Sequence, residues 1–225
     1  MSSATRPWLE PAPVEVPADL AAAVGGHPLV AATLVRRGIT TPAAARAFLD
    51  PAACAAVPAA ELPGLSAAAD RLEAAIHARE AICVWGDFDV DGQTATALLV
   101  SALADLGGVV MYRIPSRAEG HGLSPEGAAR AMAAGARVIL TCDTGISAHE
   151  AVALAGDRGV DCIITDHHDL PTTLPAARTI VNPKLAAGGD GQTANGRGNA
   201  PSFATLRGVG VAYKLAEELY ARAGR

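Results

Sequence analysis

From residue 81 to the C-terminus, short apolar runs alternate with amphipathic stretches of helical length. Runs of five or six apolar residues are typical of buried strands, and Ala and Leu recur between them at helical spacing. Strands are expected at 81–85, 109–114, 137–142, 160–165 and 177–182, and helices at 94–107, 124–135, 147–159 and 208–224. This alternation predicts an open, doubly wound, mainly parallel five-stranded α/β sheet with right-handed crossovers.

The first 80 residues follow a different pattern. Residues 1 to about 18 are rich in proline and are expected to be extended. Short helices are predicted at 27–38 and 40–50, each with a proline near its start, and a longer amphipathic helix at 66–80. The chain is therefore divided into an extended N-terminus with a helical arm, residues 1–80, and the α/β domain, residues 81–225.

Composition narrows the class of protein. Half of the residues are hydrophobic but only 4% are aromatic, which suits Ala-rich helices packed on buried Val-rich strands. The net charge of −5 argues against a protein that coats nucleic acid non-specifically, because that mode needs a basic surface. It leaves room for an enzyme whose acidic residues hold cations that then receive phosphates.

The lack of a recognisable targeting signal and the cysteine spacing favour a cytoplasmic protein with no membrane partner. The N-terminus has no apolar segment of a secretory signal, and no apolar stretch is long enough to cross a membrane. The cysteines, Cys54, Cys83, Cys142 and Cys162, form no CxxC pair. Three of them lie in apolar runs, which favours buried, reduced side chains over a redox or zinc role.

Carboxylates and histidines follow three of the predicted strands. Because ligands of open α/β sheets bind at the carboxyl ends of the strands, these side chains are expected to converge on one edge. Their mutual repulsion then calls for a cation. They are Asp87, Asp89 and Asp91 after the first strand, Asp143 after the third, and Asp166, His167 and His168 after the fourth.

The donor types indicate the metal and its chemistry. Oxygen and imidazole donors without thiolate suit Mn²⁺ or Mg²⁺. A carboxylate such as Asp143 could bridge two ions about 3.5–4 Å apart, which would clamp a phosphoryl group during an in-line displacement. The residues thus predict metal-dependent phosphoester hydrolysis.

Each motif also has a structural interpretation. The aspartates after the first and third strands could be helix caps or turn residues, whereas two adjacent histidines at a strand end are harder to explain by packing. The remaining histidines are expected to be solvent-facing or loop residues. They are His27, His77, His121 and His149. The chain has no NTPase phosphate loop, dinucleotide fingerprint or nucleophile elbow.

Several motifs together resemble one family. The stretch GDFDVDG is similar to the motif GDYDADG of the DHH phosphoesterase superfamily, and Asp166-His167-His168 is similar to the triplet that names it. Within it, IPSR…EGHGL is similar to IPxR…EGYGL of the RecJ branch, and LRGVGVAYKL is similar to LAGVGVAFKL. TIVNPK also resembles that branch, so the resemblance covers most of the chain.

The resemblance implies a site with two Mn²⁺ or Mg²⁺ ions. Asp87 and Asp89 would be ligands of the first motif, Asp143 the bridging ligand and His167 the third-motif ligand. Asp91 would lie at a helix N-terminus or would support the ligands without binding an ion itself. Cys83 stands where many DHH enzymes have a histidine, as is typical of RecJ-like members.

Three further residues would act around the ions. His168 would face the scissile phosphate, and Asp166 would orient the two histidines. Arg117, in the loop after the second strand, would grip a DNA phosphate.

The implied activity is that of a 5′→3′ single-stranded-DNA exonuclease in DNA repair and recombination. Single-stranded DNA would be the substrate, and a single-strand-binding protein and a helicase the protein partners. A fourth motif with a metal-binding Asp is expected beyond residue 225, so the domain would be incomplete at its C-terminus and its activity alone stays open.

Three alternatives stay open. Another DHH enzyme would act on short oligonucleotides, cyclic dinucleotides or pyrophosphate. A haloacid-dehalogenase-type phosphatase would form an aspartyl-phosphate on Asp87 and would not need His167. A truncated, non-catalytic domain would bind a partner protein. The conformation of the Gly-rich loop at 186–204 is left unassigned.

Overall fold

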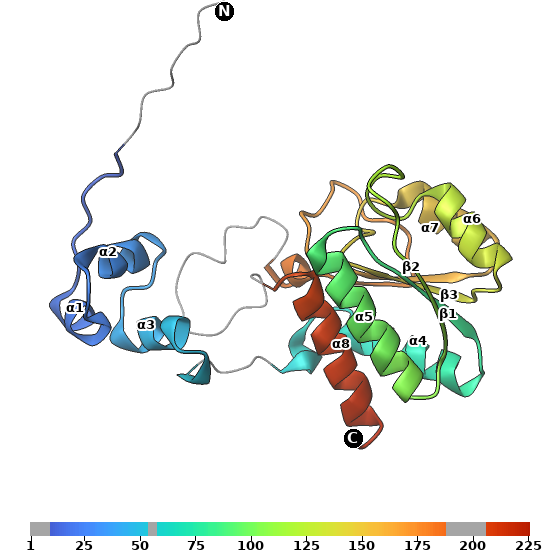
Figure 1. Ribbon diagram of the computed structural model, residues 1–225, viewed down its shortest axis with the longest axis horizontal. Helices are drawn as coiled ribbons and strands as arrows, with labels where there is room; N and C mark the ends of the chain where they lie inside the picture. Colours follow the sequence, from blue (N-terminus) through green and yellow to red (C-terminus); the bar gives the residue numbers. More distant parts are fainter. Residues whose placement is uncertain (1–9, 54–57, 188–205) are drawn as a thin grey trace, which may run out of the picture. The chain divides into compact units, whose positions relative to one another are not determined.

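The computed structural model describes residues 10–53, 58–187 and 206–225, which form two compact units. The smaller unit lies within residues 10–53, and the larger comprises the other described residues (Figure 1). The loop at 186–204 lies almost wholly outside the described residues, as does Cys54. The elements are α1 (Ala18–Val24), α2 (Pro28–Arg36), α3 (Pro42–Leu49), η1 (Pro51–Ala53), η2 (Ala59–Glu61), α4 (Leu65–His77), β1 (Ala81–Trp85), α5 (Val90–Asp105), β2 (Val109–Arg113), α6 (Pro125–Ala133), β3 (Val138–Cys142), α7 (His149–Asp157), β4 (Asp161–Thr165), β5 (Thr179–Val181), η3 (Pro183–Ala187) and α8 (Gly208–Arg222).

The smaller unit contains the first helices of the arm that the sequence pattern assigns to residues 1–80. Its helices α1, α2 and α3 pack around a small core of Leu20, Leu34 and Ala45. The Thr41 hydroxyl caps α3 by accepting the N–H of Ala44. A proline in the first turn and a side-chain cap mark the starts of α2 and α3, which the sequence predicts, whereas α1 has no side-chain cap and was not predicted.

The larger unit contains the predicted sheet. All five strands are parallel, in the order β2-β1-β3-β4-β5, and they lie close to the expected positions. The strand order reverses between β1 and β3, and in open α/β sheets the crevice at the carboxyl ends of such a pair is where ligands bind. The predicted fold class is therefore confirmed.

Successive strand residues point to opposite faces of this sheet, as the pleat requires. Helices α4, α5 and α8 cover one face, where Ile82, Val84 and Leu140 are buried. Helices α6 and α7 cover the other face, over Cys83 and Ile139 (Figure 1). Much of the helical contribution to both cores is alanine, which accounts for the low aromatic content.

Two boundaries differ from the sequence pattern. Helix α4 contacts β5 and α8, so the larger unit includes a helix that the pattern assigns to the arm. Helix α5 begins at Val90 instead of residue 94, because the Asp89 carboxylate caps it by accepting the N–H of Gly92. A helix cap was one interpretation of the aspartates in this motif, and the structure shows Asp89 in that role, with the helix starting four residues earlier than expected from the apolar pattern.

The described cysteines are free and buried, as expected for reduced strand residues. Burial raises the pKa of Cys83 to about 11 and those of Cys142 and Cys162 to about 12. Such thiols are protonated at neutral pH and are poor metal ligands. In the described part of the chain, no helix combines the length and hydropathy needed to span a bilayer.

Replacement of a central strand residue should destabilise the larger unit. Leu140 is 0% exposed in the core beneath α4, α5 and α8, so Leu140→Ala should lower the free energy of unfolding by about 2–5 kcal/mol in urea denaturation. Leu174 is 41% exposed, and Leu174→Ala should change it by less than about 0.5 kcal/mol. Equal losses in both variants would contradict this core.

Candidate metal centre

Asp143 occupies the end of β3 in an unusual conformation. Its φ of 61° lies in the left-handed region, which is strained for a residue with a side chain, and the residue is 1% exposed. Within the described residues no group donates a hydrogen bond to its Oδ1. A buried carboxylate oxygen without a donor is costly, and backbone strain of this kind clusters at functional sites.

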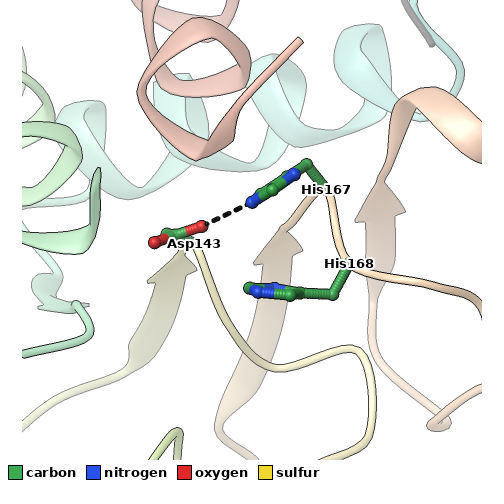
Figure 2. A group of neighbouring side chains, drawn as sticks. All are labelled: Asp143, His167 and His168. Carbon is green, nitrogen blue, oxygen red and sulfur yellow. Dashed lines mark ion pairs between the residues drawn. The ribbon is translucent and has the colours of Figure 1, made fainter. Parts of the chain in front are cut away.

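Two histidines face this carboxylate from the segment after β4 (Figure 2). His167 Nε2 lies 3.1 Å from Asp143 Oδ1, at an angle that makes no hydrogen bond. One ligand atom each of Asp143, His167 and His168 lies within 4.8 Å of the others. This is the spacing of side chains that can share a cation.

Asp166 holds the histidine pair in place. Its Oδ1 accepts the backbone N–H groups of His167 at 2.7 Å and His168 at 3.1 Å, and its Oδ2 accepts that of Ile146 at 3.0 Å. Oδ1 also lies 2.7 Å from Nδ1 of His168. Burial would raise the pKa of Asp166, but these donors together lower it. The Asp166 carboxylate thus holds the backbone of both histidines and the ring of His168.

The charges of the site are unevenly compensated. Burial, with the nearby charges of Asp91 and Asp89, raises the pKa of Asp143 to about 8. Burial and the charge of His168 lower the pKa of His167, whereas the hydrogen bond to Asp166 raises that of His168 to about 8. At neutral pH His167 is therefore a neutral imidazole, the form that can bind a metal, and His168 is largely cationic.

Asp91 lies nearer to this group than the sequence suggests. Its Oδ2 is 3.6 Å from His167 Nε2. The same carboxylate accepts the backbone N–H groups of Gly208 at 2.9 Å and Val209 at 2.7 Å, in the first turn of α8. The positive end of α8 is thereby directed at the acidic cluster.

Gly208 permits this approach of α8. A Cβ at this position would overlap the carboxylate of Asp143. At the other end of the helix, Arg222 donates hydrogen bonds to Asp70 and Glu73 of α4. Helix α8 is thus held at both ends, with its glycine against the buried carboxylate.

The other carboxylates of the first motif have local partners. Asp89 caps α5, as described above, and its side chain is exposed to solvent. Asp87 is 3% exposed; its Oδ1 accepts the N–H of Phe88 at 2.8 Å, and its Oδ2 lies 2.9 Å from Nδ1 of His121. The guanidinium of Arg117 lies 4.4 Å from the centre of the Phe88 ring, which places the predicted phosphate-binding residue beside the first motif.

The structure thus brings Asp143, His167 and His168 together and adds Asp91 to them. Sequence reasoning assigned Asp91 to a helix N-terminus or to a supporting role, and did not foresee that its Oδ2 lies 3.6 Å from His167 Nε2. It also regarded His121 as an ordinary loop residue. The ring is indeed 73% exposed, but its contact with Asp87 depends on a long-range approach that no local pattern reveals.

The donor set fits a hard divalent cation. The buried Asp143 oxygen lacks a donor among the described residues, a neutral imidazole faces it, and three more carboxylates contribute to the raised pKa of Asp143. Oxygen with imidazole donors suits Mn²⁺ or Mg²⁺ better than a soft metal. A cation here would compensate the charge that the protein leaves uncompensated.

Comparison with known proteins agrees with this fold and site. The family model described as "DHH family, N-terminal domain" matches residues 81–225. The chain therefore belongs to the DHH family.

Its similar curated relatives carry one name. The chain is 39% identical over 193 residues to the "Single-stranded-DNA-specific exonuclease RecJ" of Bacillus subtilis, which covers 85% of this chain and 23% of that protein. It is 44% identical over 161 residues to the Escherichia coli protein of that name, and the match covers 71% of this chain and 26% of that protein. The chain spans about a quarter of the length of these curated relatives.

Solved structures give the same result. A RecJ structure in complex with Mn²⁺ from Thermus thermophilus superposes with a TM-score of 0.67 at 30% identity, over 94% of this chain and 28% of that one. A second structure, of exonuclease RecJ bound to manganese, superposes with a TM-score of 0.62 at 35% identity, over 75% of this chain and 40% of that one. The resemblance to RecJ inferred from the motifs is confirmed.

The buried carboxylate should leave a pH signature in metal-free protein. Asp143 keeps its proton up to about pH 8 in the folded chain but loses it near pH 4 when unfolded, so this site disfavours folding increasingly between these values. In chelator, Asp143→Asn should raise the free energy of unfolding at pH 9 by about 1–3 kcal/mol and change it little below pH 4.

Urea denaturation in EDTA at pH 4, 6.5 and 9 measures this difference. Asp157→Asn, at an exposed carboxylate in α7, is the matched control and should show no such gain. A gain that is the same at every pH would contradict the assignment to Asp143.

Proposed function

We propose that the chain is the N-terminal part of the catalytic core of a RecJ-type 5′→3′ single-stranded-DNA exonuclease. It would hydrolyse phosphodiester bonds with the help of two Mn²⁺ or Mg²⁺ ions. The observation that carries the proposal is the buried Asp143 carboxylate, which lacks a hydrogen-bond donor and faces His167 and His168. The names of the RecJ relatives supply the substrate class.

In this proposal Asp143 would be a ligand of both ions. His167, whose Nε2 lies 3.1 Å from Asp143 Oδ1 and 3.6 Å from Asp91 Oδ2, would be a ligand of one ion together with Asp91. Asp89 and Asp87, from the loop between β1 and α5, serve the second ion. Asp91 joins the ligand set expected from the sequence because of its approach to His167.

Ions bound here would polarise the phosphoryl group and supply a hydroxide nucleophile at neutral pH. The chain's own residues orient the reacting groups. Asp166 fixes the ring of His168 through Nδ1, and the pKa of about 8 keeps this imidazole largely protonated at pH 7. His168, which is 56% exposed on its side chain, would face the scissile phosphate and stabilise charge that develops on its oxygens.

Arg117 is the residue we assign to the DNA phosphate. It is exposed, and its guanidinium lies over Phe88, between the first two aspartates of the motif. A guanidinium can bind a phosphate with two hydrogen bonds while it stacks on a ring. The residues after β1 and the loop after β2 would then both contact the DNA strand.

The cellular setting follows from the RecJ resemblance. We place the protein in the cytoplasm, in DNA repair and recombination, with a single-strand-binding protein and a helicase as partners. The substrate is a polyanion that would meet an acidic sheet edge, so cations would be required for its approach.

Mn²⁺ titration calorimetry on the chain tests the metal site. The wild-type chain should bind two ions, and Asp143→Ala should weaken binding by more than the ~100-fold that loss of a ligand's supporting partner costs, since both ions lose a ligand. Asp157→Ala, at an exposed site, should bind as the wild type does. A folded wild-type chain that binds no Mn²⁺ would contradict the proposal.

Nuclease assays separate the competing activities. With Mn²⁺, single strands carrying a 5′-phosphate should be shortened from that end, in preference to dinucleotides, and His167→Ala should abolish the activity. Retained phosphatase activity in His167→Ala would instead support an aspartyl-phosphate mechanism. Hydrolysis of dinucleotides alone would support another DHH activity.

A further inference from the structure

Two buried carboxylates at this sheet edge each face the Nδ1 atom of a histidine. Asp166 Oδ1 lies 2.7 Å from Nδ1 of His168, and Asp87 Oδ2 lies 2.9 Å from Nδ1 of His121. The first pair belongs to the proposed mechanism. The second joins the β1–α5 loop to the β2–α6 loop, 34 residues apart in sequence, and the proposed mechanism gives it no role.

The position of His121 is set by contacts on both sides. Its ring packs on that of Phe88, with centroids 4.3 Å apart and a tilt of 42°. The next residue, Gly122, accepts a hydrogen bond from Nε1 of Trp85 at 3.1 Å, so this part of the loop is tied to the end of β1. The ring therefore has a defined orientation although 73% of its side chain is exposed.

The contact constrains the Asp87 carboxylate. A carboxylate accepts hydrogen bonds and does not donate them, so Nδ1 of His121 is the donor. With Phe88 N–H on Oδ1 and His121 on Oδ2, the plane of the carboxylate is fixed, and each oxygen keeps a further lone pair. Hydrogen bonds that orient a metal-binding carboxylate in this way support the affinity of the site.

We propose that His121 is a positioning residue of the metal centre, which acts through the Nδ1–H hydrogen bond that orients Asp87. This inference rests on the proposed function, since it assigns Asp87 to the ion-binding group. The motif EGYGL, which this stretch resembles, has Tyr where this chain has His121.

Two substitutions in the full chain isolate the hydrogen bond. His121→Ala removes it, whereas His121→Asn keeps an N–H donor near the place of Nδ1 and removes the rest of the ring. In Mn²⁺ titration calorimetry, His121→Ala should weaken the affinity of one ion by about 10-fold or more, and His121→Asn should restore it to within about threefold of the wild type.

Exposed His149, in the first turn of α7, provides the matched control, and His149→Ala should bind Mn²⁺ as the wild type does. The midpoint temperature of thermal unfolding in EDTA should be nearly the same for all four proteins, because His121 contributes little buried surface. This comparison separates a change of metal affinity from a loss of fold.

The outcomes distinguish this inference from the proposed function. If the wild type binds Mn²⁺ and His121→Ala binds it equally well, the positioning role is overturned and the metal site stands. If Ala and Asn weaken binding equally, the Nδ1 hydrogen bond is not the cause and the inference again fails. If the folded wild type binds no Mn²⁺, the proposed function fails and this inference fails with it.

Discussion

The buried carboxylate of Asp143 is the feature on which the site depends. It lies at the end of the central strand β3, in a strained backbone conformation, with one oxygen that receives no donor from the described residues. Other carboxylates raise its pKa further, so the protein by itself opposes the ionised form. A fold that retains such a group is adapted to a cation, and cation binding would then contribute to its stability.

The sheet topology explains why these residues meet. The order β2-β1-β3-β4-β5 reverses direction at β1 and β3, so the chain leaves these two strands towards opposite faces of the sheet and a crevice opens between the loops that follow them. The histidines arrive from β4, the next strand along. Asp143, Asp166 and His167 stand within two residues of the end of a buried strand, which holds their side chains more precisely than a place in a long surface loop would.

Helix α8 completes the site although it is remote in sequence. Its first N–H groups bind Asp91, and its glycine at position 208 lets the backbone lie against Asp143. The helix also packs on α5, whose N-terminus carries the first motif. Packing of the hydrophobic face and electrostatics at the helix end thus act together, and the loop with His121 provides the corresponding support on the side of Asp87.

The strands, their parallel arrangement, the edge at which the acidic residues gather and the family are all predictable from the sequence. These follow from short-range information, namely the alternation of apolar runs with helices and the motifs at strand ends. Caps such as Thr41 were also readable. Only the tertiary structure decided which carboxylate of the first motif lies beside His167, and it placed Asp91 there. It also showed the partner of Asp87 and the inclusion of α4 in the larger unit. Those facts depend on contacts between segments distant in sequence, whose geometry arises from packing, so no local pattern could reveal them.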